Sequence, residues 1–280
     1  KFLRAILFGE KLDASDFAEA DWKSIFQLAD EQTVSALLLD GMSLLPSECI
    51  TIPLGDKLKR IAAMQRIEQM NRLHRKVIVK IDQALKSEGI PVVFMKGQTT
   101  ALRYPNPLHR TPGDIDFVVD PKDFKKTMEV LEKIGKVNHD LVHEHHGMAW
   151  VDGVTVEPHY KVHNYQSPST DHAMQEMFAS VFPSELSSAD MDGYAVPVFP
   201  PTFESVFLIS HMVNHVYEEG LGLRQVIDYA MFLSSCADKI DWLQHHEYLH
   251  QMHMERAWRI FTCICVDYLG MSLPSQVEAF

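Results

Sequence analysis

Two aspartates two positions apart inside an apolar run constrain this chain more than any other feature. The stretch RTPGDIDFVVDP, residues 110–121, is typical of a buried strand, yet it carries Asp114 and Asp116. Because side chains alternate along a strand, both carboxylates project to one face. Burying two like charges so close together is costly unless a cation or strong hydrogen-bond donors compensate. The pair therefore predicts a metal site; the structural alternative is a cap role for Asp114 and an ion pair of Asp116 with Arg110.

The surrounding pattern places this strand in a small α/β unit. A helical pattern without Pro or Gly covers residues 57–88 and stops at Gly89, and the apolar run IPVVFM follows. KGQTTALRY then indicates a strand-to-helix junction, and the DP pair at 120–121 opens a helix that runs to residue 134. The segments VNHDLVHEHH, GMAWV and VTVEPHY predict three further strands, the last two joined by a DG hairpin signal at 152–153.

The regions on either side have helical patterns, so the chain is expected to be an α+β protein with a small mixed sheet. We predict an N-terminal helical region over residues 1–88, an α/β core over 89–165 and a C-terminal helical domain over 166–280. The helical pieces predicted in the last part lie near 202–217, 222–236, 240–250 and 253–270, and YAVPVFPP can add an extended segment.

A third carboxylate follows from the predicted hairpin. In VTVEPHY the two valines face the core, so Thr155, Glu157 and His159 face the other way. Glu157 can therefore join Asp114 and Asp116 on one face of the sheet. Three acidic groups suit two Mg²⁺ ions roughly 3.5–4 Å apart, which clamp the attacking and leaving oxygens of a phosphoryl displacement. We therefore predict that these three carboxylates are catalytic and bind the metal.

Lys96 and Gly97 stand where the predicted strand 90–95 leads into a helix. Gly97 lets the backbone turn closely enough for the N–H groups of a helix N-terminus to hold phosphate oxygens, and Lys96 adds charge. The spacing of a Walker A loop and its terminal Lys-Ser/Thr pair are absent. Ordinary packing of a helix on a strand is the alternative interpretation.

The order of these motifs, KG, then RTPGDID, then a later strand glutamate, resembles the polymerase-β-like nucleotidyltransferase superfamily. More narrowly, KGQTTALRYPNPLHRTPGDIDFVV, VEPHY and HMVNHVYEEGLGLRQVIDYA resemble the bacterial nucleotidyltransferases of the NTP-transferase-5 type, over roughly residues 89–235. The resemblance implies a nucleotidyltransferase core whose metal ligands are Asp114, Asp116 and Glu157. It also implies that Lys96, Gly97 and Arg110 bind the nucleotide phosphates. We predict that Gln98 and Gly113 bind the nucleotide as well.

Histidines crowd the end of the predicted sheet, at His139, His143, His145, His146, His159 and His163. Neutral imidazole is a common ligand of transition metals, but the spacing fits no named motif, and HEHHG is not HExxH on a helix. We interpret the group as surface or substrate-facing side chains, with a dedicated metal cluster as the alternative. His159 shares its predicted face with Glu157 and is expected to contact nucleotide or acceptor.

Two pairs in the helical tail are one turn apart, His211 with His215 and Arg224 with Asp228. Core packing explains the first pair and a structural ion pair explains the second. In the alternative, Arg224 reaches the cleft and binds the triphosphate or the acceptor.

Composition limits the partners and the location. A net charge of −12 makes nucleic acid an unexpected partner, since affinity for phosphate backbones comes mostly from clustered Lys and Arg. The four cysteines have neither a paired framework nor zinc-knuckle spacing and are expected to be reduced. No apolar run approaches the roughly 20 residues that cross a bilayer, and the N-terminal segment is a poor secretory signal. We expect no membrane insertion and a cytoplasmic location.

The leading functional hypothesis is an Mg²⁺-dependent enzyme that moves an NMP, with AMP favoured, from an NTP to a hydroxyl or phosphate acceptor. The acidic charge favours a small-molecule or protein acceptor. The alternative is a catalytically weak module on the same fold that binds a nucleotide or a partner. A third hypothesis, a histidine-rich metal hydrolase, has less support in the sequence.

Overall fold

A computed structural model describes residues 1–140, 145–163, 165, 167–218 and 220–277. Its strands are β1 (Val92–Met95), β2 (Ile115–Val119), β3 (Lys136–Asn138), β4 (Met148–Val151), β5 (Val154–His159), β6 (Ser187–Met191) and β7 (Tyr194–Val198). Its α-helices are α1 (Phe2–Phe8), α2 (Trp22–Glu31), α3 (Ser35–Met42), α4 (Leu54–Ser87), α5 (Gln98–Ala101), α6 (Phe124–Ile134), α7 (Pro168–Val181), α8 (Pro201–Glu218), α9 (Leu223–Cys236), α10 (Trp242–Gln251) and α11 (Glu255–Asp267).

All the strands belong to one mixed sheet in the order β3-β4-β5-β2-β1-β7-β6. β2 is parallel to β5 and antiparallel to β1, which in turn is parallel to β7. The predicted α+β class is confirmed. The extended segment expected at YAVPVFPP is β7, which pairs with β6, a strand that the sequence did not predict. The sheet therefore takes two strands from beyond residue 165.

Strand alternation divides the apolar residues of β1 and β2 between two cores. Phe94 and Phe117 point into a core with the second half of α4 and with α6. Val93 and Val118 point the other way, into a core made mostly of the C-terminal helices. Both strands are buried on both faces, which explains their continuous apolar runs. Asp116 alternates with Phe117 and so belongs to the face that meets the C-terminal helices.

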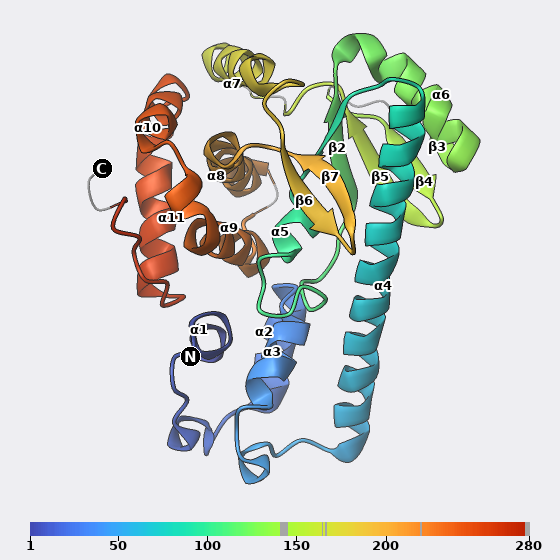
Figure 1. Cartoon of the computed structure of the whole chain (residues 1–280). Helices are drawn as coiled ribbons and strands as arrows, with labels where there is room; N and C mark the ends of the chain where they lie inside the picture. The colour runs from blue at the N-terminus through green and yellow to red at the C-terminus, as the bar shows by residue number, and fades with distance from the viewer. Residues whose placement is uncertain (141–144, 164, 166, 219, 278–280) are drawn as a thin grey trace.

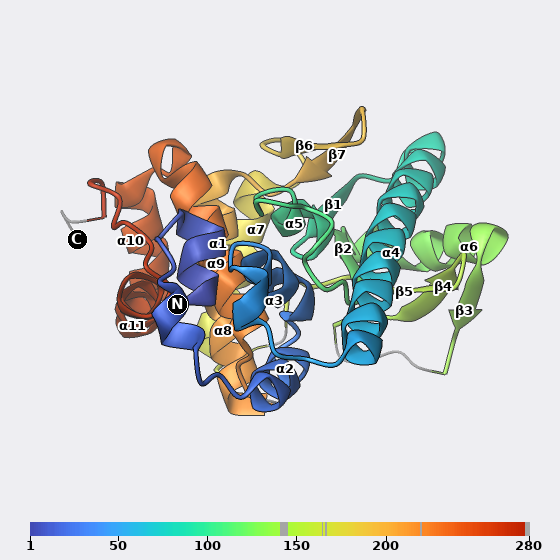
Figure 2. The same cartoon turned by 90° about the horizontal axis from the view of Figure 1, so that it is seen from below.

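The helices form two layers on the sheet (Figure 1). α4 and α6 lie along one side, and α8 to α11 lie across the other. Seen from below, α1 to α3 sit beside the C-terminal helices, away from α6 (Figure 2). Side chains of these N-terminal helices, such as Trp22 and Phe26, share one core with those of the C-terminal helices, such as Phe232. None of the described helices is long and apolar enough to cross a membrane.

Most predicted elements are found close to their expected bounds. The helix predicted over 57–88 is α4, and the four helical pieces of the C-terminal region are α8 to α11. The hairpin between β4 and β5 has positive φ at Asp152 and Gly153, as a two-residue turn of this kind requires. The strand predicted in VNHDLVHEHH is shorter, because β3 ends at Asn138; residues 141–144 lie outside the described part of the chain. α7 was not predicted.

Candidate active site

Three carboxylates meet on the sheet face that looks toward the C-terminal helices. Asp116 of β2 stands directly opposite Glu157 of β5 in the parallel register, and Asp114 precedes Asp116 by two residues on the same face. Glu157 is also hydrogen-bonded to Asp114. The hairpin between β4 and β5 and the parallel pairing of β5 with β2 thus place together the three residues for which the sequence predicted a shared site.

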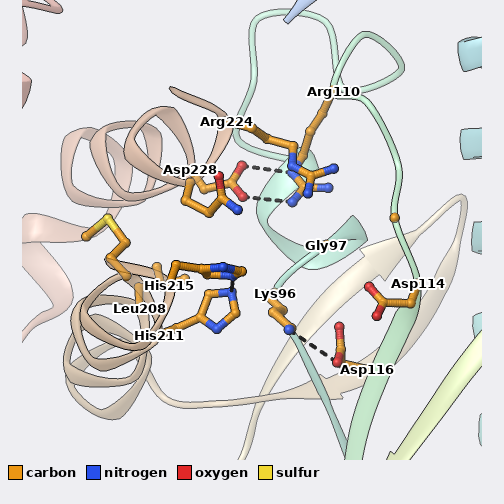
Figure 3. A pocket seen from close by; sticks show the side chains of 13 residues that line it. Lys96, Gly97, Arg110, Asp114, Asp116, Leu208, His211, His215, Arg224 and Asp228 are labelled. Atoms are coloured by element: carbon orange, nitrogen blue, oxygen red, sulfur yellow. Dashed lines mark hydrogen bonds and ion pairs between the residues drawn. The ribbon is translucent and has the colours of Figure 1, made fainter. Parts of the chain in front are cut away.

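Asp116 is buried, with 2% of its side chain exposed, and two partners hold it. The Lys96 ammonium lies 3.2 Å from Oδ1 of Asp116 (Figure 3), and Nε2 of His159 donates to the same oxygen at 3.1 Å. Burial alone would raise the pKa of Asp116, but the ammonium and the imidazole outweigh it and lower this pKa to about 2. The structural alternative for Asp116 named Arg110 as its partner, and the structure has Lys96 and His159 there instead.

Glu157 is the protonated member of the three carboxyl groups. Burial, together with the nearby charges of Asp116 and Asp114, raises the pKa of Glu157 to about 8. The three carboxyl groups together therefore carry more negative charge than the Lys96 ammonium alone can neutralise. Hard oxygen donors with excess negative charge are the ligands that Mg²⁺ prefers, so these residues fit a divalent cation.

The junction between β1 and α5 has an unusual backbone. Lys96 has a φ of 42° and Gly97 a φ of 58°, both in the region that side chains rarely adopt. This backbone places the Lys96 ammonium at Asp116 and starts α5 beside the carboxylates. α5 is only four residues long. The positive φ explains the glycine at 97, because glycine has no Cβ and adopts this backbone without strain. A residue with a side chain is strained there, and strain of this kind is typical of functional sites.

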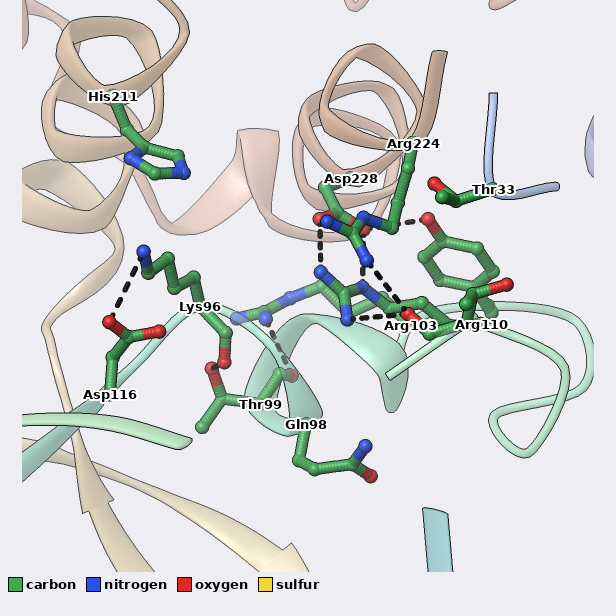
Figure 4. A network of polar contacts seen from close by, with 12 residues as sticks. Thr33, Lys96, Gln98, Thr99, Arg103, Arg110, Asp116, His211, Arg224 and Asp228 are labelled. Atoms are coloured by element: carbon green, nitrogen blue, oxygen red, sulfur yellow. Dashed lines mark hydrogen bonds and ion pairs between the residues drawn. The ribbon is translucent and has the colours of Figure 1, made fainter. Parts of the chain in front are cut away.

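Gln98, predicted to bind nucleotide, turns its side chain away from the carboxylates (Figure 4). Its Nε2 donates to Oδ1 of Asn71 on α4. Nδ2 of Asn71 in turn donates to the backbone oxygens of Leu108 and Arg110, at 2.7 and 2.9 Å. The Gln98 side chain therefore anchors the loop that leads to β2, and only its backbone lies at the junction.

Arg110 and Arg224 lie side by side but have different partners (Figures 3 and 4). Arg110 is buried and makes a bidentate ion pair with Asp228 of α9, at 2.8 and 2.7 Å, and Tyr104 donates to the same carboxylate at 2.6 Å. Asp228 therefore forms its ion pair with Arg110, from a distant segment, in place of the pair expected with Arg224. Arg224 donates to the Thr111 carbonyl at 3.3 Å, and its Nε is buried without a partner in the described part of the chain.

Two cavities flank the carboxylates. The first, of about 220 Å³, is lined by the Lys96-Gly97 junction, by Gly113 and by both arginines. The second, of about 280 Å³, is lined by Glu157, His159 and further histidines. Four residues line both cavities: Lys96, Asp114, His211 and His215. Asp116 faces the first cavity and Glu157 the second, so the carboxylates form the boundary between a cationic space and an imidazole-rich one.

His211 and His215 were interpreted as core residues, and the structure places them at the site instead. They lie on the face of α8 that turns toward Lys96, and their Nε2 atoms are 3.1 Å apart (Figure 3). Burial, with Lys96 next, lowers the pKa of His211 well below its ordinary value, so this imidazole is neutral. Their spacing of one helical turn, and their place in the segment that carries the family resemblance, are signals in the sequence that could have placed them beside the carboxylates.

A strand–glycine–helix junction beside paired aspartates and a glutamate from the next strand is the arrangement of a nucleotidyltransferase. The chain matches, over residues 18–270, the family described as uncharacterised nucleotidyltransferase. This protein belongs to that family, which confirms the resemblance and implies an NTP substrate. A comparison with curated proteins gives no match.

Solved structures with similar folds include two of the antibiotic-resistance factor ANT(2'')-Ia. Its solution structure has a TM-score of 0.46 at 13% identity and covers 67% of this chain and 98% of its own. Its crystal structure with adenylyl-2''-tobramycin has a TM-score of 0.44 at 13% identity and covers 64% and 98%. An antigenic nucleotidyltransferase-like protein from Paracoccidioides brasiliensis has a TM-score of 0.39 at 14% identity and covers 66% and 91%.

Proposed function

We propose that this nucleotidyltransferase transfers an NMP, with AMP as the favoured group, from an NTP to a hydroxyl or phosphate acceptor and releases pyrophosphate. One observation carries the proposal: the three carboxylates lie on the boundary between a cavity lined by two arginines and a cavity lined by further histidines. A transfer reaction needs its two substrates on either side of the reacting phosphorus. In this proposal the first cavity takes the triphosphate and the second takes the acceptor.

The first cavity is suited to a polyanion. Lys96, Arg110 and Arg224 line it, together with Gly97 and Gly113. Burial, with Arg110 next to it, lowers the pKa of Arg224, and its buried Nε lacks a partner among the described residues. A phosphate oxygen would supply the missing acceptor and the missing negative charge. Arg110 is already paired with Asp228, so its role is to hold the loop and add positive potential.

Asp114, Asp116 and Glu157 would hold Mg²⁺. The ions, when bound, would neutralise the triphosphate and polarise the phosphoryl group that is transferred. The fit rests on the donor set: three carboxylates, of which Glu157 keeps a proton because burial and the charges of Asp116 and Asp114 raise its pKa. Lys96 is the counter-ion of Asp116 in the structure, and its flexible side chain can turn from that oxygen to the phosphates.

In the reaction, an acceptor oxygen forms a bond to the α-phosphorus of the NTP, and the bond from that phosphorus to pyrophosphate breaks. Glu157 lines the second cavity, and in its ionised form, which bound Mg²⁺ would favour, it takes the proton that a hydroxyl acceptor loses. Lys96 and Arg224 neutralise the charge that develops on the departing pyrophosphate. His159 keeps Asp116 in place and faces the second cavity, where it contacts the acceptor.

The test begins with binding. Thermal unfolding is measured with each of the four NTPs, with and without Mg²⁺; a ligand at about 100 times its dissociation constant adds roughly 2.7 kcal/mol to the free energy of unfolding. Candidate acceptors are then supplied with the stabilising NTP, and pyrophosphate release is followed. Stabilisation by Mg²⁺–NTP together with acceptor-dependent pyrophosphate release supports the proposal. Binding without turnover would favour the catalytically weak module that binds a nucleotide. No binding of any NTP would contradict the transfer proposal and leave only a module that binds a partner.

A further inference from the structure

Imidazoles from two segments meet on the wall of the second cavity. A ring nitrogen of each of His145, His146 and His159 lies within 4.8 Å of those of the other two. The ring centroids are 4.5 Å apart for His145 and His146, 5.0 Å for His146 and His159, and 5.4 Å for His145 and His159. His163, whose ring lies 5.1 Å from that of His145, lines the same cavity.

The backbone holds these rings together without any ligand. His146 forms a β-bridge with His159. Gly147 donates to the carbonyl of Pro158 at 2.9 Å, and Tyr160 donates to the carbonyl of His145 at 3.0 Å. The segment before β4 is thus fastened along β5, so the three imidazoles need little rearrangement to share one ion.

A second observation points to a ligand. His159 is 4% exposed, and its Nδ1 is buried without a hydrogen-bond partner within the described residues. Its other nitrogen donates to Asp116. A neutral imidazole that donates its N–H to a carboxylate keeps a lone pair on the other nitrogen, and this carboxylate–histidine arrangement is the one that orients histidine ligands of metals. Nε2 of His163 is likewise buried and lacks a partner in that part of the chain.

We propose that His145, His146 and His159 hold a transition-metal ion of the Zn²⁺ type, at a site next to the Mg²⁺ site of the carboxylates, because Nε2 of His146 lies 3.7 Å from Oε2 of Glu157. The donor types separate the two ions: imidazole nitrogen suits Zn²⁺, whereas carboxylate oxygen suits Mg²⁺. Three protein ligands leave the fourth position of a tetrahedral ion open to the second cavity, where it can bind an anionic or hydroxyl group. This proposal does not depend on the transfer reaction.

The experiment is a calorimetric titration with Zn²⁺ of the full chain stripped by a chelator, in millimolar Mg²⁺ so that the carboxylates are occupied. We expect one Zn²⁺ per chain. H145A and H146A should each weaken Zn²⁺ binding by about tenfold or more. D114N alters the carboxylates alone and should bind Zn²⁺ as the unchanged chain does. H172A is the matched control, because His172 is an exposed histidine on α7 that pairs only with Glu176 among the described contacts.

The absorption spectrum of the Co²⁺-loaded, unsubstituted chain gives a readout that needs no variant. Tetrahedral nitrogen ligation gives intense visible bands, and octahedral oxygen ligation gives weak ones. Intense bands that Zn²⁺ removes support the site even if a histidine variant fails to fold. The proposal is overturned if the bands are weak, if no Zn²⁺ binds in the presence of Mg²⁺, or if D114N loses Zn²⁺ while H145A and H146A keep it.

Discussion

Asp116 on β2 stands directly opposite Glu157 on the parallel strand β5, and the two carboxyl groups are in opposite protonation states. Lys96 and His159 keep Asp116 charged, with a pKa of about 2. Oε2 of Glu157 lies 3.7 Å from Nε2 of His146 and 4.0 Å from Nε2 of His159, but burial and the charges of Asp116 and Asp114 raise its pKa to about 8. An acid that stays protonated beside one that stays ionised is typical of catalytic carboxylates, because their environments push the two pKa values apart.

Stability without metal should depend on pH through Glu157. Its pKa of about 8 in the folded chain lies above the ordinary 4.5, so between these values the folded chain binds a proton that the unfolded chain has lost. The contribution of Glu157 to the free energy of unfolding should therefore fall as pH rises through this window. Urea unfolding of the unchanged chain and of E157Q at several pH values in EDTA measures this contribution as the difference between their slopes. Equal slopes in the two chains would show that Glu157 is not responsible.

Mg²⁺ binding in the presence of NTP should become tighter with rising pH over the same window. The ion and the proton compete for Glu157, so binding below a pKa of about 8 releases a proton. Titration calorimetry in two buffers of different ionisation enthalpy measures that release. E157Q should release none, and equal release by both chains would place the proton elsewhere.

D114N and D116N should differ in stability but not in activity. D116N leaves the Lys96 ammonium without its buried partner and should lower the free energy of unfolding by about 3 kcal/mol. D114N removes a like charge beside Glu157 and should leave the metal-free chain as stable as before, or more so. Each should reduce Mg²⁺-dependent transfer by about 10² or more. Full activity in either variant would remove that aspartate from the mechanism.

Substitutions of the two neighbouring arginines should also have different effects, one on stability and the other on nucleotide affinity. R110A breaks the buried pair with Asp228 and should cost about 3–5 kcal/mol of stability. Among the described residues, R224A removes one hydrogen bond to a carbonyl, so the variant should fold normally. Its NTP affinity should fall by roughly 10 to 100-fold through the loss of a charged hydrogen bond. Chemical unfolding and nucleotide titration measure both quantities. If R224A binds NTP normally, Arg224 does not contact the phosphates.

G97A should impair nucleotide binding through the backbone. An added Cβ meets only the Asp114 carbonyl, at an ordinary 3.7 Å, but the φ of 58° is strained for alanine and costs about 1–3 kcal/mol. G193A is the matched control, because Gly193 has a φ of 92° in the hairpin between β6 and β7 and open space around it. Both variants should lose stability, and only G97A should lose NTP affinity. Equal affinities would mean that the junction does not hold phosphate.

Local sequence patterns were enough to predict most helices and strands of the fold. The long run without Pro or Gly predicted α4, the DG pair predicted the hairpin of β4 and β5, and apolar runs predicted β1 and β2. β6 was missed because SSADM has no apolar alternation that marks a strand; it is an edge strand, held by its hairpin with β7. α7 was missed because its signals, Ser167 as cap and Pro168 at the first turn, lie inside a segment that resembles a loop.

The sequence by itself determined that Asp114 and Asp116 share one strand face and that Glu157 and His159 share another, because strand alternation and a two-residue hairpin are local rules. Only the tertiary structure decided that Glu157 joins the two aspartates and which other residues meet them. The pairing of β2 with β5 puts Glu157 opposite Asp116. Asp228 of α9 forms its ion pair with Arg110, and His211 of α8 lines the same cavity as Lys96. These contacts join residues far apart in the chain, and their geometry depends on how whole elements pack, which no local spacing encodes.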